Sequence, residues 1–143
     1  MKNIVLGILF IAGLSFFQSS CKKKNQSVPY VPVDVYINVS LPAYINLSAP
    51  GGWVYVSGGS KGLIVYRQTL TKFMVYDRHC TYNIDNPCGA AVVDSSNVSI
   101  SCACDGSIYQ IFDGAVTNGP ATFNLHQYST DFDELNNNLH IYN

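Results

Sequence analysis

Residues 98–112 read VSISCACDGSIYQIF, and they set the fold class that the sequence favours. Two short apolar runs, Val98–Cys102 and Ser107–Phe112, flank a segment that contains Asp105 and Gly106. Short runs rich in β-branched and aromatic residues, bounded by turn residues, are typical of β-strands. The stretch therefore predicts two neighbouring strands whose connection carries two cysteines.

The same strand-and-turn pattern continues along the rest of the chain. Asp34–Leu41 alternates, with Val35, Ile37 and Val39 on one side, which predicts a half-buried strand. Further strands are expected at Trp53–Val56, Gly62–Tyr66, Lys72–Asp77, Ala121–Tyr128 and Leu139–Tyr142. No long window shows the apolar stripe of a helix, although residues 131–138 could hold one helical turn. These patterns predict an all-β sandwich or barrel.

The four cysteines after Cys21 form two clusters. Cys80 and Cys88 make the first, and Cys102 and Cys104 make the second. Paired clusters in an exported β-domain indicate disulfides, a metal, or both. A zinc site made from all four is disfavoured, because the one-residue gap in the second cluster directs its sulfurs poorly for one tetrahedron.

These clusters resemble the two boxes of the Rieske iron–sulfur family. Residues 102–107 read C-A-C-D-G-S where the family reads C-P-C-H-G-S, and residues 80–82 read C-T-Y where the family reads C-T-H. Cys88 follows after a five-residue stretch, Asn83–Pro87. Downstream, residues 114–128 resemble the family's G…GPA…L…Y segment, which holds the loop that covers the cluster.

The resemblance implies a Rieske-like fold, a small antiparallel β sandwich or barrel with a cluster-binding subdomain. We expect this β-domain over residues 34–143, with the subdomain over about 76–128.

The positions of the metal ligands depart from the family pattern. In the family, one iron takes two Cys thiolates and the other takes two His imidazoles. The resemblance places Cys80 and Cys102 at the thiolate positions, and Tyr82 and Asp105 at the His positions. A neutral phenol is a poor ligand, and a carboxylate is hard and anionic. We therefore expect no cofactor; the alternative is an electron-transfer protein that keeps a [2Fe–2S] cluster on these four residues.

The resemblance also implies a disulfide between Cys88 and Cys104, as in high-potential members of the family. Without a cluster, Cys80 and Cys102 would face each other across an empty site, and we predict a second disulfide there. His79 is expected to be an exposed residue at a strand end. His126 and His140 are expected away from both boxes and are assigned no chemistry.

The N-terminus predicts export and lipid anchoring. Lys2 precedes an apolar run, Ile4–Phe17, which has the length of a signal-peptide core and is too short for a typical membrane span. Small residues directly before Cys21 resemble a bacterial lipobox, although Gln18 stands where Leu is usual. The alternative is ordinary secretion with Cys21 free or removed. The expected organisation is a signal peptide (1–20), a lipidated cysteine with a flexible tether (21–33) and the β-domain.

Composition excludes several function classes. The net charge is -1 and 12% of residues are charged, so no basic surface for nucleic acid is expected. No phosphate-binding loop precedes a helix. We expect a non-enzymatic module of the cell envelope, on the periplasmic or outer-surface side, that binds a membrane through its lipid and has an unidentified protein partner.

Overall fold

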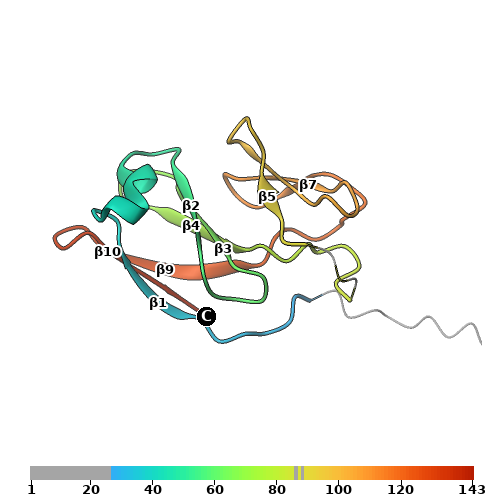
Figure 1. The fold of residues 1–143 in the computed structure, drawn as a ribbon, viewed down its shortest axis with the longest axis horizontal. Coiled ribbons are helices and arrows are strands. Elements are labelled where there is room, and N and C mark those ends of the chain that lie inside the picture. The colour runs from blue at the N-terminus through green and yellow to red at the C-terminus, as the bar shows by residue number, and fades with distance from the viewer. Residues whose placement is uncertain (1–26, 86, 88) are drawn as a thin grey trace, which may run out of the picture.

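The computed structural model describes residues 27–85, 87 and 89–143. Within these residues the chain forms two antiparallel sheets (Figure 1). The larger sheet has the order β1 (Asp34–Asn38), β10 (Asn138–Tyr142), β9 (Gln127–Asp133), β4 (Phe73–Asp77), β3 (Leu63–Arg67) and β2 (Trp53–Val56). The smaller sheet has the order β5 (Val92–Val93), β6 (Ser99–Ser101), β7 (Ile108–Gln110) and β8 (Val116–Asn118). The all-β, antiparallel fold class expected for a Rieske-like domain is confirmed.

Strands β3 and β4 lie between two separate apolar cores. Because side chains alternate along a strand, Val65 and Val75 point into the first core, whereas Ile64 and Tyr76 point into the second. Every residue of β4 is buried, as expected for a strand covered on both faces. The β3–β4 hairpin predicted from the sequence is confirmed.

The first core is enclosed by the curled larger sheet and a short 3₁₀ helix, η1 (Pro42–Ser48). Its buried members are Val33, Ile37, Val39, Leu47, Val54, Leu63, Val65, Phe73, Val75, Tyr128, Leu139 and Ile141. The second core lies between β3–β4 and the smaller sheet. Its buried members are Ile64, Met74, Tyr76, Cys80, Ala91, Ile100, Cys102, Tyr109, Ile111, Ala121 and Leu125.

Two local expectations were wrong. Residues 121–126 are not a strand, because the last strand of the smaller sheet is β8 and the next strand, β9, begins at Gln127. Residues 131–138 hold no helical turn, since β9 runs to Asp133 and β10 begins at Asn138. The outward face of β9 is polar, with Asp131 and Asp133 exposed, and this polarity obscured the inward positions in the sequence.

Among the described residues, no helix has the length and apolarity needed to cross a bilayer. The residues expected to form the signal peptide, together with Cys21, lie outside the described residues.

Candidate functional site

A disulfide joins the two boxes. Cys80, which follows β4, is bonded to Cys102, which follows β6, with 6.0 Å between their Cα atoms. Both residues are buried members of the second core. The disulfide predicted between these two cysteines is therefore present, and it ties the larger sheet to the smaller one.

The second box folds as a tight turn around Cys102. The carbonyl oxygen of Cys102 accepts a 2.9 Å hydrogen bond from the Gly106 amide, and the Cys102 amide donates to the Ser107 carbonyl at 2.9 Å. Gly106 has a φ of +77°, which favours glycine because it has no Cβ. The carboxylate of Asp105 accepts a 2.7 Å hydrogen bond from the Ser107 amide. Asp105 therefore stabilises the turn that presents it.

The first box is tied to its neighbours by a chain of hydrogen bonds through Thr81. The Thr81 amide donates to the Tyr109 hydroxyl at 3.2 Å. The Thr81 hydroxyl donates to the Phe123 carbonyl at 2.6 Å, and it lies 2.9 Å from the Tyr109 hydroxyl. A single buried threonine thus connects the first box to β7 and to the loop that contains Phe123.

That loop, which includes a cis Gly119–Pro120 bond, packs on the second box. The Ala121 amide donates to the buried Ser107 hydroxyl at 2.9 Å. The loop is closed by a 3.0 Å bond from the Leu125 amide to the Gly114 carbonyl. Gly114 has a φ of +73°, and a Cβ there would lie 2.7 Å from the Tyr76 ring. Glycine is required at this position for both reasons.

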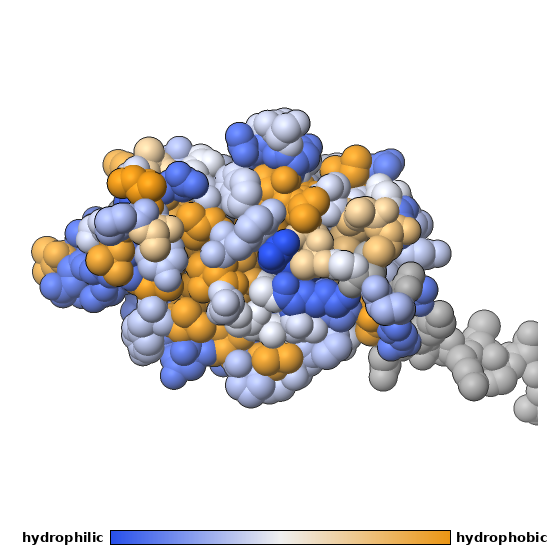
Figure 2. Space-filling model, in the orientation of Figure 1, coloured by the Kyte–Doolittle hydropathy of each residue, from blue (hydrophilic) through white to orange (hydrophobic). Residues whose placement is uncertain are grey.

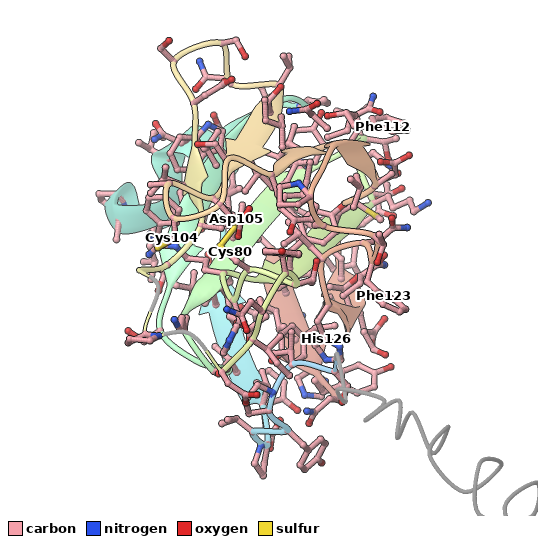
Figure 3. All side chains as sticks on the ribbon, turned by 90° about the vertical axis from the view of Figure 1, so that its right-hand side faces the viewer. Cys80, Cys104, Asp105, Phe112, Phe123 and His126 are labelled. Carbon is pink, nitrogen blue, oxygen red and sulfur yellow. A yellow bond between two sulfur atoms is a disulfide. The ribbon has the colours of Figure 1, made fainter. Side chains whose placement is uncertain are left out.

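Three of the four positions that the family uses for metal ligands come together. The sulfurs of Cys80 and Cys102 and a carboxylate oxygen of Asp105 lie within 4.8 Å of one another. Figure 3 shows Cys80 and Asp105 side by side. The fourth residue, Tyr82, is 43% exposed. These residues do not fit a [2Fe–2S] cluster, because the two sulfurs are bonded to each other and the other two positions hold no imidazole.

Cys104 is also disulfide-bonded. Its expected partner, Cys88, lies outside the described residues, so the Cys88–Cys104 pairing stays a prediction.

His79 is buried, so the expectation of an exposed residue at a strand end was wrong. Its Nδ1 lies 2.8 Å from the Ser60 hydroxyl, and its Nε2 lies 3.1 Å from the Ile84 carbonyl. A carbonyl only accepts, so Nε2 donates to Ile84, and in the neutral form of the ring the Ser60 hydroxyl donates to Nδ1. The ring thereby connects the β2–β3 turn to the loop of the first box, a partnership that sequence position alone does not reveal.

Asp77 is the polar centre that sequence reasoning missed. Its buried carboxylate accepts hydrogen bonds from the Ser60 amide at 2.6 Å, the Lys61 amide at 3.2 Å, the His79 amide at 2.8 Å and the Tyr128 hydroxyl at 2.8 Å. Burial, followed by the bond to Asp77, raises the pKa of Tyr128 above its ordinary value. A signal was present in the sequence. Asp77 ends the second strand of the predicted hairpin, and the glycine-rich turn of residues 58–62 precedes the first strand, so antiparallel pairing brings the two together.

Ser60, His79 and Asp77 do not form a catalytic triad. The Asp77 carboxylate contacts the backbone amide of His79, whereas the His79 ring contacts Ser60 and the Ile84 carbonyl. In a triad, the carboxylate would hold the ring nitrogen opposite the one that faces the serine. This cluster therefore holds loops together and does not activate a nucleophile.

The other two histidines lie in different parts of the fold. His140 stacks on Tyr36 with 4.0 Å between ring centroids, and its Nε2 lies 2.7 Å from an Asp34 carboxylate oxygen. His126 lines a shallow pocket together with Thr81 of the first box. The expectation that His126 lies away from both boxes was therefore wrong.

No protein-family model and no curated protein matches this chain. Among solved structures, the chain is similar to the ferredoxin of carbazole 1,9a-dioxygenase from Nocardioides aromaticivorans IC177. The TM-score is 0.47 and the sequence identity is 15%, over 79% of this chain and 98% of the ferredoxin. This degree of similarity assigns neither a family nor an activity to the chain.

Proposed function

We propose that the protein is a lipid-anchored, Rieske-like domain of the cell envelope that has lost its iron–sulfur cluster. In this proposal it acts as a disulfide-stabilised structural or binding module and not as an enzyme. The single observation that carries the proposal is the Cys80–Cys102 disulfide. It uses both sulfurs that would ligate iron, at a site where Tyr82 and Asp105 stand in place of imidazoles.

The hydrogen bonds around the site support a structural role. Asp105 caps the turn of its own box through the Ser107 amide. Thr81 is hydrogen-bonded to Tyr109 and to the Phe123 carbonyl. In the same loop, the Ala121 amide donates to the Ser107 hydroxyl. A disulfide of this kind persists in an oxidising compartment, which agrees with the export signal that the N-terminus predicts.

The test of cluster loss is spectroscopic. Protein lacking residues 1–21 is purified without oxygen and without added thiol, and its visible absorption, low-temperature EPR, iron, sulfide and free thiols are measured. We expect a colourless protein without stoichiometric iron or sulfide and with four oxidised cysteines. A broad visible charge-transfer band with stoichiometric iron and sulfide would overturn the proposal in favour of an electron-transfer protein.

A matched double variant tests the role of the ligand positions. Tyr82→His with Asp105→His supplies the two missing imidazoles, while Tyr82→Phe with Asp105→Asn changes the same positions without supplying them. If the missing imidazoles are the reason for cluster loss, only the histidine variant binds iron and sulfide.

Lipid anchoring is tested on the full chain exported with its own leader. We expect the mature protein to begin at Cys21, with the mass of added acyl chains, and to float with vesicles. Cys21→Ser is expected to abolish flotation, because a protein without acyl chains lacks the anchor. A mature protein that carries no acyl mass would reject this part of the proposal.

A further inference from the structure

The described chain begins at the end of the molecule that carries the first box. Ser27 and Val28 line a shallow pocket together with Thr81, Phe123 and His126. Figure 3 is viewed from this end and shows Phe123 and His126 there. In Figure 1 the β9–β10 turn lies at the opposite end of the molecule.

The distance between this end and the predicted lipid anchor is limited by chain length. Ser27 follows Cys21 by six residues. Fully extended, such a segment spans at most about 20 Å, and as a flexible coil it spans about 13 Å. An acylated Cys21 therefore keeps Ser27, and the end of the domain beside it, close to the bilayer.

This end presents aromatic side chains to solvent. Phe123 is 52% exposed, and Tyr82 is 43% exposed. The bond from the Thr81 hydroxyl to the Phe123 carbonyl holds the Phe123 loop against the residue that precedes Tyr82. In Figure 2, apolar residues in tan and orange lie among polar residues in blue at the right-hand end of the molecule.

We propose that the end formed by Val28, Tyr82 and Phe123 docks on the lipid surface that holds the Cys21 anchor. Aromatic side chains are favoured at the membrane–water interface. Lys22, Lys23 and Lys24 lie between the acylated residue and the domain, where they complement anionic headgroups. This inference rests on the lipid anchor proposed above and adds an orientation to it.

The orientation has a consequence for partners. With this end against the bilayer, the exposed side chains of the first box face lipid, and the buried Cys80–Cys102 disulfide lies behind them. The β9–β10 turn, with Asp133, Glu134 and the 94% exposed Leu135, faces away from the membrane. A soluble partner then reaches the outer faces of the larger sheet and not the end that carries the first box.

Quenching by brominated lipids tests the orientation. Phe123→Trp and Leu135→Trp place a tryptophan at opposite ends of the domain, both at exposed apolar positions. Each lipidated variant is incorporated into vesicles of phosphatidylcholine and phosphatidylglycerol, with and without bromine near the headgroup end of the acyl chains. Wild-type protein, whose single tryptophan is Trp53, gives the baseline that is subtracted.

We expect the added emission of Phe123→Trp to fall about twofold in brominated vesicles, because an interfacial indole lies near the bromines. The added emission of Leu135→Trp should not change. Equal quenching of the two variants, or none in either, would overturn the docking.

Flotation of the same samples separates the two proposals. If the protein floats and Phe123→Trp is not quenched, the anchor stands and the docking is wrong. If the protein does not float, the anchor fails and the docking fails with it.

Discussion

The two sheets of this protein are stabilised in different ways. The larger sheet has strands of four to seven residues and packs a continuous apolar core against η1. The smaller sheet has strands of only two or three residues. Strands this short bury little apolar area on their own. The smaller sheet therefore depends on its packing against β3 and β4 in the second core, on the Cys80–Cys102 disulfide and on the bonds through Thr81 and Ser107.

The comparison shows that the two sheets depend on different kinds of contact. The larger sheet is stabilised by its apolar core, whereas the smaller sheet combines apolar packing with a few cross-links at fixed positions. A disulfide supplies such a link with the same two cysteines that a metal centre would use. The link between the sheets therefore depends on the two sulfurs and not on Tyr82 or Asp105.

The largest effect is expected from Asp77→Ala in the larger sheet. The substitution leaves the partly buried Ser60 amide, the buried His79 amide and the buried Tyr128 hydroxyl without their acceptor. We expect a loss of about 4 kcal/mol of unfolding free energy, because each unpaired buried donor is costly. Urea denaturation followed by circular dichroism and by Trp53 fluorescence measures it. Both probes should shift together, because β4 contributes to both cores.

Asp133→Ala is the matched control, since it removes an exposed carboxylate that caps the β9–β10 turn through Leu135 and Asn136. Its effect should be much smaller. Equal losses in the two variants would show that burial of Asp77 is not what matters.

The second largest effect is expected from removal of the disulfide, which should destabilise the smaller sheet more than the larger one. Cys80→Ala with Cys102→Ala removes a cross-link between residues 22 apart, which is worth about 3 kcal/mol in the chain-entropy model. Hydrogen exchange should show lost protection for amides in β6 and β7 and retained protection in β1 and β10. Uniform loss in both sheets would break the comparison, because the disulfide would then support the larger sheet as well.

The smallest effect compares one tyrosine from each core. In the second core, the Tyr76 hydroxyl is buried without a hydrogen-bond partner among the described residues, whereas Tyr128 in the first core donates to Asp77. Removing an unpaired hydroxyl should raise stability, and removing a paired one should lower it, each by about 1 kcal/mol. Urea midpoints of Tyr76→Phe and Tyr128→Phe at pH 7 measure this. Changes of the same sign would contradict it.

The same pair predicts a dependence on alkaline pH. Burial raises the pKa of Tyr76, with smaller contributions from Asp113 and Tyr66, and burial also raises the pKa of Tyr128. A raised folded pKa gives stability that is complete below the ordinary value of 10.0 and is lost as pH rises above it. Each Phe variant should therefore lose less stability than wild type between pH 9 and about pH 11.

Local pattern was enough to predict most of the larger sheet. Trp53–Val56 was predicted to its boundaries, and the hairpin of β3 and β4 to within one residue at each end. The pattern failed at β8 and β9. There a polar outward face hid the inward positions of Tyr128 and Phe132, and only pairing with β4 and β10 fixes the strand.

The candidate site was predicted in part. The resemblance implied that Cys80 and Cys102 face each other, and they are bonded. Neither the resemblance nor the sequence pattern revealed that His79 is buried or that His126 lies beside the first box. These placements depend on loops whose contacts join residues far apart in the chain, such as Thr81 with Phe123.

The sequence alone determined the features that depend on neighbouring residues. These are the alternation that predicts strands, the glycine and proline residues that predict turns, the order of the cysteine boxes and the apolar run before Cys21. The hydrogen bonds to the buried Asp77 carboxylate, and the two cores on opposite faces of β4, form only when distant segments of the chain pack together. Alternation states which side chains share a face, but burial requires a second surface to cover that face. For Asp77, that cover comes from a turn and a strand that lie 17 and 51 residues away along the chain.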